Sequence, residues 1–128
     1  MPAKHLYEYA VLRFVPCAAR QEFVNVGVLL YCKSPRFIGM KWALNEERIL
    51  CFCPTANLQE VRAYLESMEK ICAGGKMSSP IGLLDAPSRF RWLSATRSTI
   101  LQVSPVHPGL CESPEAALAS IFQEQVEG

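Results

Sequence analysis

The residues best suited to chemistry are concentrated between positions 89 and 109. This stretch reads Arg-Phe-Arg-Trp-Leu-Ser-Ala-Thr-Arg-Ser-Thr-Ile-Leu-Gln-Val-Ser-Pro-Val-His-Pro-Gly, and no acidic residue occurs between Asp85 and Glu112. It holds three arginines instead: Arg89, Arg91 and Arg97. Guanidinium groups beside hydroxyls hold phosphate or carboxylate through charge-assisted hydrogen bonds. The stretch is therefore a candidate anion-binding segment.

Two features of this stretch carry most of the chemistry. Arg97 is followed by Ser98 and Thr99 at the entrance of a predicted strand, where the three groups can converge on an oxyanion. His107 stands between two prolines and can accept or donate a proton near neutral pH. A structural role is nevertheless the leading interpretation, because arginines on a short helix usually form a solvated face. Anion or nucleic-acid contact ranks second and catalysis third, since catalysis needs several groups around one pocket.

Standard catalytic and metal-binding patterns are absent from the sequence. There is no phosphate loop, Gly-x-Ser-x-Gly elbow, dinucleotide fingerprint or His-Glu-x-x-His. None of the six cysteines forms a Cys-x-x-Cys, and the two histidines stand apart, so paired zinc ligands are missing. We expect reduced, structural cysteines, no metal and no cofactor. No motif supports an enzyme.

The element that must position these groups is a strand at residues 22–32. Val24, Val26 and Val28 alternate along it, which predicts that they share one face of a sheet. Residues 5–15 are rich in aromatic and β-branched side chains and predict a neighbouring antiparallel strand.

The apolar pattern of this hairpin also suggests a register. Pairing residues whose numbers sum to 36 sets Leu12 opposite Val24, and it sets Tyr9 over the bare backbone of Gly27.

Further strands are expected at 37–44 and 98–103, and helices at 57–73 and 114–126. In the first helix, Asn57 with Glu60 forms a capping-box start. A short helix is expected after Asp85, an extended piece at 49–53, and an irregular connection at 104–112. The pattern predicts an α+β fold: an antiparallel sheet of about four strands, packed by two main helices.

Composition favours an ordinary globular chain. With 128 residues, half of them apolar and a fifth charged, residues 1–128 are expected to form a single domain. The net charge of +1 offers no broad basic surface for nucleic acid. No apolar run reaches the roughly 18 residues of a spanning helix, and the start lacks a secretory signal, so we expect a cytoplasmic protein without membrane contact.

One surface of the predicted sheet is a candidate for binding another molecule. If both main helices cover the same face, the other face, with Tyr7, Tyr9 and Phe23, is left without a cover. The favoured hypothesis is a non-enzymatic accessory protein that binds another protein, or a second copy of itself, through this face or its edge. The alternative is a phosphate, nucleotide or nucleic-acid binding module that uses residues 89–107.

Several segments together resemble one protein family. They are residues 7–11, 22–28, 89–93, 97–99 and 104–107. In this order, and nearly end to end, the chain is similar to the bacterial domain-of-unknown-function family 3037. The resemblance implies a small single-domain bacterial protein with no assigned activity. Proteins of this family look like frequent genomic neighbours of kinases that resemble the serine-kinase toxins of persistence modules, so the resemblance suggests a role as a partner.

The resemblance is close in the arginine-and-hydroxyl stretch, which adds weight to one cluster. Its members are Arg97, Ser98, Thr99, Gln102, Ser104 and His107. This cluster either binds a ligand or ties the loop to the sheet.

Overall fold

The chain forms a five-stranded antiparallel sheet in a computed structural model that describes residues 4–17, 22–75, 80–95 and 100–127. The strands are β1 (His5–Cys17), β2 (Glu22–Cys32), β3 (Phe37–Trp42), β4 (Leu101–Val103) and β5 (His107–Cys111). They lie in the order β3-β2-β1-β4, and β5 pairs with β1 beyond the end of β4. The long strand β1 is thus paired along both of its sides.

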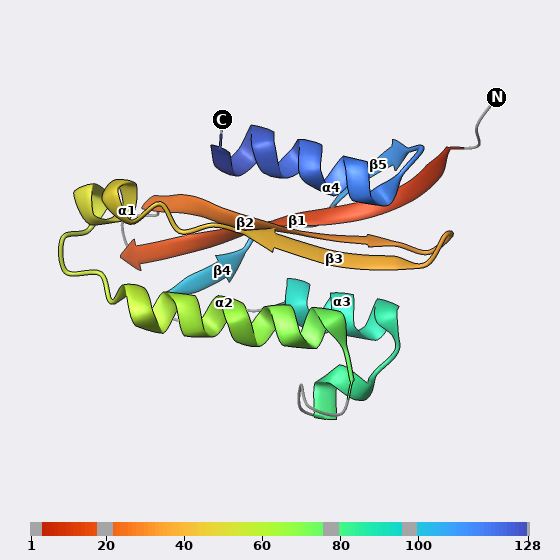
Figure 1. The fold of residues 1–128 in the computed structure, drawn as a ribbon, viewed down its shortest axis with the longest axis horizontal. Helices are drawn as coiled ribbons and strands as arrows, with labels where there is room; N and C mark the ends of the chain where they lie inside the picture. The colour runs from red at the N-terminus through yellow and green to blue at the C-terminus, as the bar shows by residue number, and fades with distance from the viewer. Residues whose placement is uncertain (1–3, 18–21, 76–79, 96–99, 128) are drawn as a thin grey trace.

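Helices cover both faces of this sheet. They are α1 (Glu46–Phe52), α2 (Leu58–Ala73), α3 (Ala86–Ser94) and α4 (Pro114–Phe122), with a 3-10 turn η3 (Pro80–Leu83) and a π-helical turn η4 (Gln123–Glu127). Figure 1 shows α4 on one face and α2 with α3 on the other. Asn57, Asp85 and Ser113 each cap a helix, because their side chains accept the N–H three residues further on.

The predicted α+β fold is confirmed. The helix expected at 57–73 begins one residue later because Asn57 is its cap, and the helix expected at 114–126 ends as the turn η4. The third strand ends at Trp42 rather than residue 44. Of the strand expected at 98–103, residues 101–103 are found, and 98–99 lie outside the described residues.

The predicted hairpin register is wrong. Leu12 lies opposite Gly27 and Tyr9 opposite Leu30, an offset of three residues. The register shifts between Leu12 and Arg13, where β2 has the extra residue Val26. Such a bulge interrupts the alternation that the prediction assumed.

The same bulge overturns the expected valine face. Val24 and Val26 lie in a core beneath α2 and α3, whereas Val28 and Leu30 lie in a second core beneath α4. One strand therefore supplies side chains to both cores, and the molecule has three layers.

Two connections are more regular than expected. The extended piece predicted at 49–53 is wrong: residues 46–52 form the helix α1, because Asn45 accepts the N–H of Arg48 and Ile49 is buried on the inner side. Residues 107–111 form β5, since they pair with the first half of β1.

A substitution at Gly27 tests how closely the strands pack at this bulge. A Cβ there would lie 2.9 Å from the carbonyl oxygen of Lys41 and 2.9 Å from Cβ of Trp42, atoms that can move only with the backbone. Gly27→Ala should therefore lower the free energy of unfolding by about 1–3 kcal/mol in urea titration. At Gly39 the nearest atoms are the ring end of Phe37 and a methyl of Leu118, which can turn aside. Gly39→Ala should cost less, and the reverse ranking would contradict the packing described.

Candidate functional site

The predicted site residues do not converge on one point. Arg97, Ser98 and Thr99 lie outside the described residues. Arg89 and Arg91 belong to α3, on the face shared with α2. In contrast, Gln102 points to the α4 face, because its neighbours on β4 are buried beneath α2 and α3. His107 lies on that α4 face as well, against Tyr9.

Arg89 and Arg91 make local contacts on α3. Arg89 Nη1 donates to the carbonyl oxygen of Leu84 at 3.2 Å, and the guanidinium occupies the space that a side chain at Gly74 would need. Gly74 has φ +80°, a conformation that favours glycine. Arg91 is exposed, and its Nε donates to Pro87 O at 3.4 Å. These contacts tie the turn before α3 to the helix.

Ser104 joins its loop to the sheet. It is 1% exposed, and its Oγ accepts the N–H of Val11 at 2.8 Å and donates to Pro105 O at 2.9 Å. Its own N–H donates to Val11 O at 2.8 Å. The β4 ladder starts at Leu12 and the β5 ladder ends at Tyr9, so Ser104 fills the gap between them.

On the face of the sheet that α4 covers, a strip beside this helix is partly exposed. We define this open strip by Tyr9, His107, Arg13 and Phe23. The helix packs mainly on β2 and β3. Tyr9 and Arg13 of β1 are half-exposed on this face and His107 of β5 is exposed, whereas Val11 between Tyr9 and Arg13 is buried. Tyr7 and Tyr9 are half-buried against the α4 core, so the predicted bare face is partly covered because the helices lie on opposite sides. The Tyr9 and His107 rings lie 5.4 Å apart between centroids.

Arg13 is the functional candidate that sequence reasoning missed. It lies directly between Asn25 of β2 and Gln102 of β4, in a row across three strands. Its guanidinium carbon lies 4.2 Å from the ring centre of Phe23, which is 45% exposed. Its Nε is buried and has no hydrogen-bond partner among the described residues.

Asn25 lies directly opposite Arg13 on β2, and it also has a buried polar atom without a hydrogen-bond partner among the described residues. Its Nδ2 donates to Gln125 O at 3.0 Å, which anchors the turn η4. Its Oδ1 is buried and unpaired within the part of the chain that is described. A donor and an acceptor without partners thus belong to directly opposed residues, and a carboxylate, which only accepts, would satisfy the Arg13 donor alone.

A groove of about 520 Å³ continues the strip between α4 and β5. Tyr7 lies on its floor, with its ring across Gly109, where any side chain would collide with it. Burial raises the pKa of the Tyr7 hydroxyl, as do nearby Tyr9, Cys111 and Glu124. The groove is thus lined by the un-ionised hydroxyl of Tyr7 and by two carboxylates, those of Glu112 and Glu124.

The cysteines with described side chains form no metal centre. No group of three or more His, Cys, Asp or Glu that could hold a metal occurs among the described residues. Burial raises the pKa of the Cys72 thiol to about 12, so this cysteine stays protonated and inert on the core side of α2.

Comparison with known families identifies the family of this chain. The model of a protein family of unknown function, DUF3037, matches residues 9–126. The chain belongs to this family. No curated protein and no solved structure matches the chain. None of the helices within the described residues is long and apolar enough to cross a membrane.

The role of Ser104 can be measured directly. Ser104→Ala leaves the buried N–H of Val11 without its acceptor, and it should lower the free energy of unfolding by about 1–3 kcal/mol. Hydrogen exchange at the Val11 amide should accelerate. The control is Ser94→Ala, because Ser94 Oγ only donates to Arg91 O near the surface. Equal losses in the two variants would contradict the role assigned to Ser104.

Proposed function

We propose that this member of the DUF3037 family is a non-enzymatic protein-interaction domain. Its partner protein binds the open strip on the α4 face, where it packs on Tyr9, His107 and Phe23. A carboxylate of the partner pairs with Arg13. The exposed Phe23 ring beneath the Arg13 guanidinium is the observation that carries this proposal.

The chemistry of the strip favours an acidic segment. Among the described residues, no carboxylate lies within ion-pair distance of Arg13. The ion pair found in that part of the chain joins Arg62 to Glu46. Aromatic side chains and arginine are the residues most enriched at the energetic centres of interfaces. An arginine stacked on an aromatic ring is held in place, so less entropy is lost when it binds a carboxylate.

A kinase similar to the serine-kinase toxins is the first partner to test, because the family resemblance implies such a neighbour. The alternative, a phosphate, nucleotide or nucleic-acid module built from residues 89–107, has less support. Arg89 and Arg91 lie on the face opposite to Gln102 and His107, so they cannot hold one small anion together.

Site-specific photo-crosslinking tests the proposed face in the full chain inside bacterial cells. A benzophenone amino acid at position 23 should give a discrete cross-linked product. The matched control is position 92, because Trp92 is 47% exposed on α3, on the other side of the sheet. Mass spectrometry of the product should place an Asp or Glu beside the cross-linked residue of the partner.

Charge reversal completes this test. Arg13→Glu should remove the product formed from position 23, because two carboxylates then face each other. If Arg13→Glu does not fold by circular dichroism, His107→Asp in the exposed part of the strip serves instead. The same products from positions 23 and 92, or a product unaffected by either substitution, would contradict the proposed face.

A further inference from the structure

We propose that the outer edge of β3 is a second binding site, which accepts an extended segment of a partner protein as an added antiparallel strand. The apolar side chains of that segment face α2, and at least one carboxylate faces Lys41. This inference concerns an edge of the sheet that the strip on the α4 face does not include, so it stands or falls independently of the proposed function.

The backbone of β3 is open on its outer side. Among the described residues this strand pairs with β2 alone, and it forms one edge of the sheet. Ala43 N donates to Val26 O at 2.9 Å, so the odd-numbered residues of β3 turn their N–H and C=O toward β2. The corresponding groups of Ile38, Met40 and Trp42 therefore point outward. They have no backbone partner within the described parts of the chain.

This edge lacks two of the features that protect exposed strands from pairing, a proline and a bulge, although it is short and carries the exposed Lys41. β3 has no proline, and its register with β2 is continuous over all six residues. The opposite edge is different, because β5 contains Pro108, which lacks an N–H to donate. A regular, proline-free edge is a template for another strand, and peptide recognition by strand addition uses such edges.

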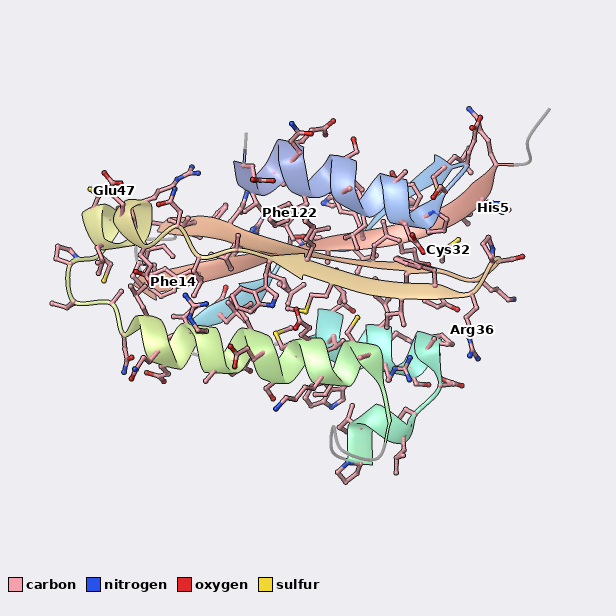
Figure 2. The ribbon with its side chains drawn as sticks, viewed as in Figure 1. His5, Phe14, Cys32, Arg36, Glu47 and Phe122 are labelled. Atoms are coloured by element: carbon pink, nitrogen blue, oxygen red, sulfur yellow. The ribbon has the colours of Figure 1, made fainter. Side chains whose placement is uncertain are left out.

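The two sides of the β3 edge differ in polarity, which sets the chemistry of the occupant. On the α2 side, Ile38, Met40 and Trp42 pack on the first core, and only the Trp42 end is polar, because its Nε1 donates to Glu69 at 2.8 Å. On the α4 side, Lys41 is exposed, with its Nζ 4.9 Å from the ring centre of Phe122. Figure 2 shows Phe122 on this side, between α4 and the sheet.

Positively charged side chains lie on the α4 side of the β3 edge and at one of its ends. Arg36 lies at the β2–β3 end of the sheet (Figure 2), and Lys41 has no ion pair among the described residues. An added strand with alternating apolar and acidic residues matches both sides, since side chains alternate between the two faces of a sheet.

A second copy of this chain does not fit the edge. Of the strands, β3 is the one on which α2 mainly packs. Two-fold pairing through β3 would place the two α2 helices about one strand spacing apart, roughly 4.8 Å. Packed helices need about 8–10 Å between their axes. The occupant is therefore a single strand that carries no helix of its own at this position.

Backbone methylation of a probe peptide tests strand addition. The probe is fluorescein-labelled Thr-Val-Glu-Val-Glu-Val-Thr, with binding measured by fluorescence anisotropy on the full chain. In the proposed antiparallel arrangement the valine amides face β3 and the glutamate amides face solvent. N-methylation of the valines should weaken binding by about tenfold or more, and N-methylation of the glutamates by less than about threefold. No binding, or equal effects of the two methylations, would overturn the proposal.

Substitutions in the chain give a second, independent readout. Met40→Pro removes an outward N–H but no bond to β2, so it should abolish binding while the fold remains. Lys41→Glu should weaken binding of the probe and favour the same peptide with lysine in place of glutamate. Arg91→Glu, an exposed charge change on α3, is the control and should leave binding unchanged. If Met40→Pro does not fold, the Lys41 exchange decides, and an absence of charge preference overturns the proposal.

Discussion

The hydrogen bonds between Val11 and Ser104 hold the middle of the sheet together. β1 is longer than either strand on its outer side, so β4 and β5 pair with its two halves and leave a gap. Ser104 closes this gap with its side chain and its main chain. Because a buried N–H without an acceptor is costly, the loop after β4 must stay in place. That position fixes where β5 begins, and β5 leads directly into α4.

The bulge in β2 is the second constraint, since it allows one strand to serve two cores. A regular strand sends alternate side chains to opposite faces, and the extra residue Val26 shifts this pattern by one position. Val24 and Val26 therefore reach the core beneath α2, whereas Val28 and Leu30 reach the core beneath α4. Gly27 lies directly after the shift, where the strands approach closely.

Local signals allowed prediction of most elements, and each miss has its own physical cause. Asn57 and Ser113 identify their helices because caps and apolar spacing are local in the chain. The register and the valine face were wrong because a bulge depends on the partner strand. β5 was missed because prolines and a glycine surround His107, and that composition is typical of loops.

The candidate site was predicted less well, for a related reason. Arg89 and His107 are close in sequence, but α3 and β5 belong to different layers of the molecule. Arg13 was not recognised, because in the sequence it is a single cation in an apolar strand. Its neighbours Asn25 and Gln102 meet it only through the pairing of three strands. Sequence proximity is a poor guide to a site when strand pairing determines which side chains meet.

The open surfaces follow from the placement of the helices. α2 and α4 both pack on β3, and α4 also packs on β2, so the two helices shield one half of the sheet from both faces. The outer part of β1 consequently keeps a half-open face on the α4 side, and β3 keeps an open backbone between two helices. These surfaces offer different interactions: rings and a guanidinium on β1, main-chain donors and acceptors on β3. The partner proposed for the first surface would be selected by its side chains, whereas the partner proposed for the second would have to be extended. Both surfaces are proposed sites for a polypeptide, so the proposed function of both is that of an interaction domain.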